Sequence, residues 1–242
     1  MPASRSPSPE NNVFAISTTL VPERDIKKPA TTNLTFDNLL PSDRALVLHE
    51  DLQEGCGGQL WPAGMVLAGY MLKYHRTDSL RGKSVVEIGA GGGLVGLAVA
   101  IGCELDHEQK IYITDQIPML ALMKKNIALN KLEEKVVAEV YDWGTSPPPA
   151  ILSPGAHHPD IVLAADCVYF EPAFPLLLQT LSDLIGPETT CYFCFKKRRK
   201  ADMRFIRDMN RNFHVEYVEY NGKEADQKEG IFLYAVKRKR KE

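Results

Sequence analysis

Residues 85–96 read VVEIGAGGGLVG, in which an apolar run meets an acid and a glycine cluster before a second apolar run begins. This pattern predicts a strand that turns into a helix. The turn needs glycine because a side chain would hold a ligand away from the backbone, and because some positions need positive φ. The free amide groups of the following helix point back at the same place. We therefore expect a nucleoside-bearing cofactor to bind here.

The glycine cluster can be read in two registers. One is G-x-G-x-x-G, the pattern of dinucleotide sites, and an acid, Asp115, follows it after about twenty residues. The other is E-x-G-x-G-x-G, in which the acid is Glu87, two residues ahead of the first glycine. A glycine-rich turn without a ligand is a third interpretation. Five small residues in succession, at positions 89–93, are more than a simple turn requires.

Length and composition indicate one α/β domain with an extension. The chain has 242 residues, of which 44% are hydrophobic, enough for a substantial core. No run approaches about eighteen apolar residues and no signal peptide is visible, so we expect a cytoplasmic protein. The five cysteines are an odd number, so we expect reduced thiols.

Charge is unevenly distributed along the chain. The net charge is −2, but ten of the 29 basic residues lie in two clusters, KKRRK at 196–200 and KRKRK at 237–241. Without them the body carries about −12, which would repel a phosphate backbone and could attract a basic protein. We interpret both clusters as solvated surface. A nuclear import signal or an RNA contact is the alternative.

The sequence divides into three regions. Residues 1–30 form a Pro/Ser-rich arm that we expect to be mostly disordered. Residues 31–83 predict an N-terminal hairpin, with strands at 45–49 and 59–61, followed by a helix over 64–74 that packs on the core. Residues 84–242 form the core with its basic C-terminal tail.

Strands and helices alternate regularly through the core. Strands are expected at 84–88, 111–114, 136–140, 161–164 and 190–195. Helices are expected at 94–102, 118–130, 173–185 and 201–212. Two final strands, at 214–220 and 231–236, flank the polar segment NGKEADQKEG, which we interpret as a turn. This order predicts a doubly wound, seven-stranded, mostly parallel sheet that ends in an antiparallel hairpin.

Candidate cofactor residues follow the predicted strands, because open α/β sheets bind ligands beyond their carboxyl ends. Asp115 follows the second strand, where a carboxylate can accept hydrogen bonds from both ribose hydroxyls; a helix N-cap is the alternative. Trp143 follows the third strand and could cover an adenine. Trp61 precedes a helix expected near the same edge. Core packing is the alternative for either tryptophan.

The segment AADCVY, which follows the fourth strand, suits the reacting end of a cofactor. Ala164 and Ala165 leave room there. Asp166 and Tyr169 could orient an incoming amine by hydrogen bonding and by contact with its cation or alkyl stem. A lysine nucleophile must first lose its proton, which an apolar pocket favours. We therefore assign Asp166 orientation ahead of proton abstraction.

These motifs together resemble family 16 of the seven-β-strand methyltransferases, which are largely protein-lysine methyltransferases. EIGAGGGLVG in its second register, Asp115, DWG, AADCVY and LWPAG carry the resemblance, which covers about residues 45–236. It implies the class I S-adenosylmethionine-dependent fold and in-line methyl transfer to a lysine. It also implies that the S-adenosylmethionine site is lined by Trp61, Gly89, Ala90, Gly91, Asp115, Trp143 and Ala165. Asp166 and Tyr169 would face the target lysine.

The pattern is most similar to members of that family that methylate translation elongation factor 1-alpha. The resemblance thus implies a protein substrate of that kind, and methylation of another protein or of RNA is the alternative. We expect a monomer that needs no metal and does not enter a membrane, and we do not expect nucleic acid as a partner.

Three other functions compete with this interpretation. Tyr192 and Lys196 have the Y-x-x-x-K spacing of NAD-dependent short-chain reductases, but they lie on a predicted strand, whereas that proton relay needs a helix. Cys191 and Cys194 form a C-x-x-C pair without a second pair at suitable spacing for a metal. A non-catalytic adaptor would show a damaged cofactor site, and here every expected position is filled.

Overall fold

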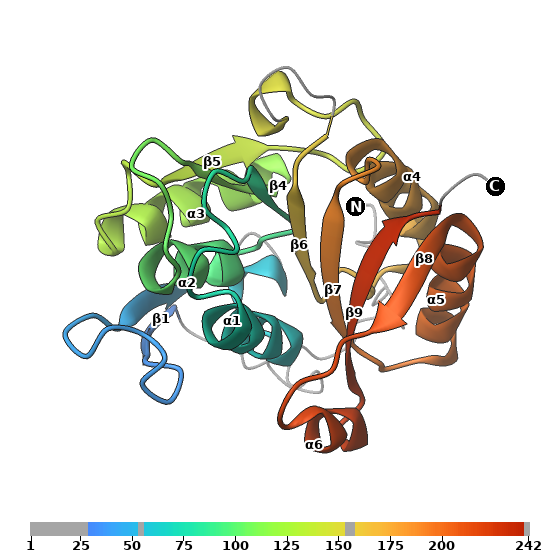
Figure 1. Cartoon of the computed structure of the whole chain (residues 1–242), viewed down its shortest axis with the longest axis horizontal. Coiled ribbons are helices and arrows are strands. Elements are labelled where there is room, and N and C mark those ends of the chain that lie inside the picture. Colours follow the sequence, from blue (N-terminus) through green and yellow to red (C-terminus); the bar gives the residue numbers. More distant parts are fainter. Residues whose placement is uncertain (1–28, 53–55, 153–157, 240–242) are drawn as a thin grey trace, which may run out of the picture.

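The protein is built on a seven-stranded mixed sheet, with a two-stranded sheet beside it (Figure 1). The computed structural model describes residues 29–52, 56–152 and 158–239. The large sheet has the strand order β5-β4-β3-β6-β7-β9-β8. Its strands are β3 (Val85–Ile88), β4 (Ile111–Asp115), β5 (Val136–Val140), β6 (Ile161–Ala165), β7 (Thr190–Lys196), β8 (Phe213–Tyr217) and β9 (Ile231–Arg238).

The five strands β3 to β7 run parallel, and the last two close the sheet as an antiparallel hairpin. Val85 of β3 lies opposite Ile111 of β4 on one side and Ile161 of β6 on the other. β9 pairs antiparallel with both β7 and β8. The doubly wound, seven-stranded sheet with a C-terminal hairpin is therefore confirmed.

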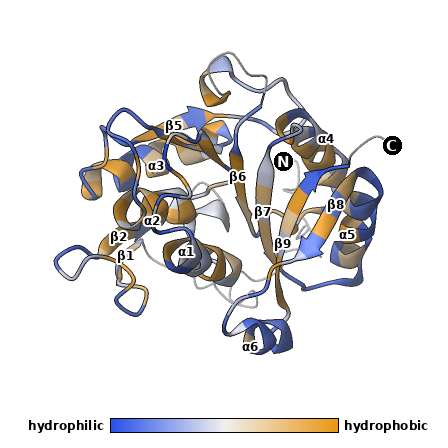
Figure 2. Ribbon diagram, viewed as in Figure 1, coloured by the Kyte–Doolittle hydropathy of each residue, from blue (hydrophilic) through white to orange (hydrophobic). Residues whose placement is uncertain are grey.

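Helices cover both faces of this sheet. One face packs against α1 (Pro62–Tyr74), α2 (Leu94–Gly102) and α3 (Ile117–Leu129), and the other packs against α4 (Phe174–Leu184) and α5 (Lys200–Asn212). Leu67, Leu97 and Ile113 belong to the first core, and Phe193 and Phe205 to the second. Apolar residues dominate the central strands and α2, which is buried on every side (Figure 2). Such a helix belongs to the interior.

The N-terminal hairpin forms, but with a different partner from the one predicted. β2 (Leu46–Glu50) pairs antiparallel with β1 (Ala30–Leu34), whereas residues 59–61 form no strand and 56–58 form a short 3-10 helix, η2 (Cys56–Gly58). Trp61 is extended, with φ −108° and ψ 140°, because Pro62 opens α1 and disfavours helical geometry in the residue before it. The segment 59–61 was predicted as a strand, and its extended backbone at Trp61 is local and pairs with no strand among the described residues.

The polar segment between the last two strands is also different from the prediction of a turn. It contains a short helix, α6 (Lys223–Lys228), which follows Gly222 at φ +99°. Glu, Ala, Gln and Lys are good helix formers, and a hydrophilic helix is stable where it is exposed to water, as Figure 2 shows for α6. Tyr220, in the segment between β8 and α6, donates a hydrogen bond to Asp226 Oδ2 of α6 at 2.9 Å.

The remaining predictions concern the ends of the chain and its loops. Most of the predicted 1–30 arm lies outside the described residues, as do the last three residues of the basic tail. The segment between β5 and β6 contains a 3-10 helix, η3 (Pro149–Ile151), and another 3-10 helix, η4 (Glu171–Ala173), precedes α4. Within the described ranges, no helix is long and apolar enough to cross a membrane.

Candidate functional site

A cavity of about 660 Å³ opens at the carboxyl ends of the parallel strands, where β3 and β6 lie side by side. The chain leaves β3 toward β4 and β5 and then returns to β6, so the winding direction reverses between these two strands. Ligands bind at such a reversal in open α/β sheets. All nine predicted site residues line this cavity: Trp61, Gly89, Ala90, Gly91, Asp115, Trp143, Ala165, Asp166 and Tyr169.

The glycines of the β3–α2 turn are required by neighbouring protein atoms. Gly91 has φ +55°, and a Cβ placed on it would lie 2.2 Å from the carbonyl oxygen of Gly57 in η2. Gly89 has φ +59°, and a Cβ there would lie 2.8 Å from the ring of Trp143. The N-terminal segment and Trp143 therefore pack directly on the turn. This close packing adds a second reason for glycine to the one drawn from the sequence.

Glu87 of β3 acts as a cap for the helix that follows the turn. The residue at the N-cap of α2 is Gly93, which has no side chain to offer, and Glu87 Oε2 instead accepts a hydrogen bond from the amide of Gly96 at 2.7 Å. Glu87 is 2% exposed. Burial raises its pKa to about 8, although the backbone amides of α2 oppose that shift. The carboxyl thus lines the cavity in a largely protonated state near neutral pH.

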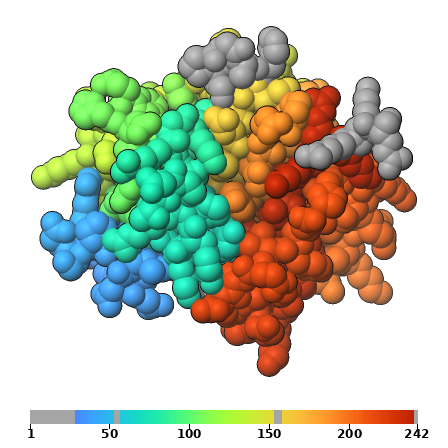
Figure 3. Space-filling model, viewed as in Figure 1, coloured from blue at the N-terminus to red at the C-terminus, as the bar shows by residue number. Residues whose placement is uncertain are grey.

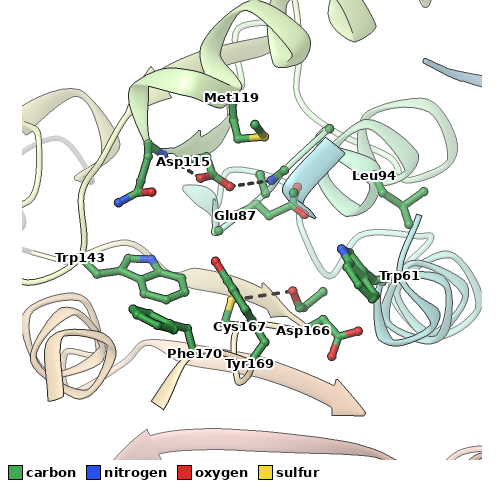
Figure 4. A pocket seen from close by; sticks show the side chains of 18 of the residues that line it. Trp61, Glu87, Leu94, Asp115, Met119, Trp143, Asp166, Cys167, Tyr169 and Phe170 are labelled. Atoms are coloured by element: carbon green, nitrogen blue, oxygen red, sulfur yellow. Dashed lines mark hydrogen bonds between the residues drawn. The ribbon is translucent and has the colours of Figure 1, made fainter. Parts of the chain in front are cut away.

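Asp115, at the end of β4, is held in place by the backbone on either side of it. Oδ2 accepts a hydrogen bond from the amide of Gly91, and Oδ1 accepts one from the amide of Gln116, both at 2.7 Å (Figure 4). The N-cap of α3 is Gln116, and α3 has no side-chain cap, so the helix-cap alternative for Asp115 is wrong. Burial raises the pKa of Asp115. Each oxygen keeps a lone pair that can accept from a ligand hydroxyl.

Two buried asparagines, Asn126 in α3 and Asn130 at its C-cap, bind the N-terminal hairpin to this side of the site. Asn126 is fully buried, accepts from the amide of His49 at 2.8 Å, and donates to the carbonyl oxygens of His49 and Gly92. Asn130 pairs in the same way with both backbone groups of Val47. In Figure 3 the hairpin (blue) lies on the flank of the molecule opposite the C-terminal strands (red). This role could not be predicted, because both asparagines fall inside a predicted helix.

The other end of the cavity gathers Trp61, Asp166 and Arg198. Figure 4 shows Trp61 and Asp166 on one side, Trp143 and Phe170 on the other, and Tyr169 between them. Asp166 is buried and takes the left-handed φ of +56° directly after β6. Arg198 pairs with its carboxylate and lies over the Trp61 ring, 5.0 Å from the ring centroid.

Arg198 and two apolar residues at the mouth of the cavity were not predicted from the sequence. Arg198 belongs to a basic run, and its position just after β7 was the signal that could have identified it. The exposed residues Phe170 and Leu176 line the mouth from the residue before η4 and from α4. Their positions depend on how η4 packs, which the sequence pattern does not give.

The residues of the competing functions are arranged differently. Tyr192 and Lys196 both lie in β7, so they do not stack on a helix as a reductase relay requires. Cys191 belongs to one hydrophobic core and Cys194 to the other, on opposite faces of the sheet, so the pair does not converge on one ion. Among the described residues, no group of three His, Cys, Asp or Glu side chains is placed to hold a metal.

The fold and the site together define a class I methyltransferase. The structure of the Thermus thermophilus 16S rRNA N2 G1207 methyltransferase, determined with S-adenosylmethionine and guanosine, superposes with a TM-score of 0.55. That match has 12% identity and covers 88% of this chain and 50% of the other. It supports the fold.

Sequence comparison assigns the chain within that class. A family model described as lysine methyltransferase matches residues 41–212. Protein-lysine N-methyltransferase EFM6 of Saccharomyces cerevisiae is 39% identical, over 91% of this chain and 96% of its own length. EEF1A lysine methyltransferase 3 of Mus musculus is 34% identical, over 68% of this chain and 67% of its own. The chain belongs to the lysine methyltransferase family, and it is an S-adenosylmethionine-dependent enzyme that acts on protein.

Proposed function

We propose that this chain methylates a lysine side chain of translation elongation factor 1-alpha, as a monomer in the cytoplasm. The observation that carries the proposal is the similarity to relatives named EEF1A lysine methyltransferase 3, from mouse and from Xenopus tropicalis. The methyltransferase cavity with all nine expected residues supports the same activity. The acidic body of the chain favours a protein partner over a nucleic acid.

The cavity fits S-adenosylmethionine in size and in chemistry. Its volume of about 660 Å³ is in the range of small-molecule sites. We assign Asp115 to the ribose hydroxyls, because each of its oxygens can accept one more hydrogen bond. Trp143 offers a flat ring for the adenine, and the turn at Gly89, Ala90 and Gly91 lines the cavity with backbone. Trp61 and the small side chain of Ala165 lie at the end assigned to the methyl group.

Asp166 and Tyr169 are assigned to the target amine. The bound cofactor supplies a methyl group on a positively charged sulfur, which leaves with the electrons of the broken bond as a neutral thioether. The protein has to position a neutral amine in line with that bond and to exclude water, and positioning of this kind lowers the barrier without a strong base. Asp166 is buried beside the cavity and Tyr169 is half-exposed at its mouth, which suits an amine that enters from outside.

The test is methyl transfer to purified, unmodified elongation factor 1-alpha. Radiolabelled S-adenosylmethionine should label the factor, and peptide mass spectrometry should place the methyl groups on a lysine. Asp166→Ala should abolish labelling while calorimetry with S-adenosylhomocysteine shows retained cofactor affinity. Asp208→Ala, a matched change in a half-exposed carboxylate on α5 outside the cavity, should leave labelling unchanged.

Other outcomes would identify a different function. Label in another protein of a cell lysate, with none in the elongation factor, would refute the substrate. Label in RNA would refute the protein target. Thermal stabilisation by NAD and none by S-adenosylhomocysteine would refute the cofactor, because a ligand at 100 times its Kd stabilises by about 2.7 kcal/mol.

A further inference from the structure

Asp166 and Arg198 form a bidentate ion pair at the end of the cavity assigned to the amine. Arg198 Nη1 donates to Asp166 Oδ1 at 2.8 Å, and Nη2 donates to Oδ2 at 2.9 Å. This parallel pair of bonds is the strongest form of contact between an arginine and a carboxylate. The Asp166 side chain is 4% exposed and the Arg198 side chain 31%. Hydrogen bonding to Asp166 raises the pKa of Arg198, so the guanidinium stays charged.

The surrounding structure fixes Arg198 in this position. Asp202, fully buried at the start of α5, accepts hydrogen bonds from the backbone amides of Arg198 and Arg199, both at 2.8 Å. The guanidinium stacks over Trp61, a favourable contact between a cation and an aromatic face. Nη1 also donates to the carbonyl oxygen of Lys196 at 3.2 Å. Hydrogen bonds therefore hold both the backbone amide and the guanidinium of Arg198 in place.

The pair leaves Asp166 with limited capacity for a ligand. A carboxylate can accept about four hydrogen bonds. Oδ1 accepts from Arg198 and from the amide of Lys196 at 3.1 Å, and Oδ2 accepts from Arg198. Among the described donors, that leaves one lone pair of Oδ2 for a substrate N–H. One fixed acceptor is sufficient to aim an amine.

The charge of the pair affects the proton on that amine. A bare carboxylate close to a lysine favours the ammonium form and raises its pKa, by about 1 to 3 units for an opposite charge within a few ångströms. An ammonium has no lone pair with which to attack a methyl group. A guanidinium bound to the same carboxylate offsets this attraction, so the apolar surroundings decide the protonation state.

We infer that Arg198 is a positioning residue that aims Asp166 and cancels its charge, so that the target amine enters a neutral site and can lose its proton. The inference rests on the proposed function, because it needs a lysine as the nucleophile. It adds a residue from the first basic cluster to the site. The remaining ionisable groups around the pair come from four places: Arg199 at the N-cap of α5 and Asp202 within it, Lys196 and Cys194 from β7, Cys167 and Tyr169 after β6, and Asp115 and Glu87 on the cofactor side.

The test compares pH profiles of kcat for methylation of the protein substrate, because kcat reports ionisations in the enzyme–substrate complex, where the amine lies beside Asp166. In Arg198→Met the acid limb of the profile should move to higher pH by about 1 to 3 units. At neutral pH kcat should fall while KM stays unchanged or decreases, because the exposed carboxylate binds the ammonium better. Arg198→Lys keeps a positive charge and should keep the limb near its wild-type position. Arg207→Met, a change in an exposed arginine of α5 outside the cavity, is the matched control.

Two further variants keep the test decisive if Arg198→Met folds poorly. Asp166→Asn leaves the arginine charge uncompensated and should move the limb to lower pH. The double variant Asp166→Asn with Arg198→Met should return it toward the wild-type position, at a lower kcat. Circular dichroism and affinity for S-adenosylhomocysteine report folding and the cofactor site separately.

The outcomes separate this inference from the proposed function. Equal loss of activity at every pH in Arg198→Met, with the limb unmoved, would mean that Arg198 has only a structural role and would overturn the inference. Movement of the limb in the same direction in Asp166→Asn and Arg198→Met would also overturn it. Failure of the wild-type enzyme to label any lysine would remove the proposed function and the inference with it.

Discussion

The buried carboxyl group of Glu87 should make the stability of the protein fall as pH rises, and Glu87→Gln should remove that dependence. Burial raises the pKa of Glu87 from 4.5 to about 8. Between these values the unfolded chain releases the proton and the folded chain retains it, so rising pH stabilises the unfolded state relative to the folded one. The free energy of unfolding therefore falls by about 1.4 kcal/mol per pH unit, and by roughly 5 kcal/mol over the whole interval between the two pKa values. Below 4.5 the full stability is present.

Urea unfolding followed by circular dichroism at pH 5, 7 and 9 measures this effect. Glutamine can accept the same hydrogen bond from Gly96 as the protonated acid, so the two proteins should differ by about 1 kcal/mol or less at pH 5. At pH 9 the variant should be more stable, by up to roughly 5 kcal/mol. Glu133→Gln, at an exposed position, should follow the wild-type curve throughout. Parallel curves for wild type and Glu87→Gln would refute the assignment of a buried, protonated carboxyl.

Three more substitutions test the packing around the cavity. Gly91→Ala should lower both the melting temperature and the affinity for S-adenosylhomocysteine, because its methyl group meets the Gly57 carbonyl oxygen at 2.2 Å; Gly69→Ala, with nothing within 4 Å, should be neutral or stabilising. Asn126→Ala should cost at least about 2 to 3 kcal/mol in urea unfolding, since it leaves buried backbone groups unpaired, and a loss below 0.5 kcal/mol would contradict the clamp. Asp115→Ala should weaken S-adenosylhomocysteine at least about tenfold by calorimetry, consistent with a charged hydrogen-bond acceptor; unchanged affinity would remove the ribose assignment.

Much of the core could be predicted because each element carries a local signal that its packing reinforces. The helix over 94–102 and the strand over 136–140 have the predicted bounds, since a glycine turn or a polar segment marks each boundary. The candidate residues converge because the carboxyl ends of parallel strands share one edge of the sheet. Asp115 ends β4, and Trp143 and Asp166 follow β5 and β6, so the topology brings all three to one cavity.

The parts that could not be predicted depend on contacts between distant segments. The strand at residues 30–34 is short and polar, and its pairing with 46–50 is stabilised through Asn126 and Asn130 far along the chain. The helix at 223–228 was missed because polarity was taken as a sign of a turn, although polarity indicates exposure and not backbone conformation. Arg198 could not be separated from its four basic neighbours until the end of β7 placed it beside Asp166.

The backbone of Gly57 packs directly against Gly91, and both glycines line the cavity. A fragment beginning at residue 84 would retain every strand of the large sheet but would lack the lining residues Gly57 and Trp61. Attempts to trim the enzyme to a minimal catalytic unit should therefore start upstream of the small hairpin, since the boundary suggested by the repeating strand and helix pattern cuts through the binding chamber.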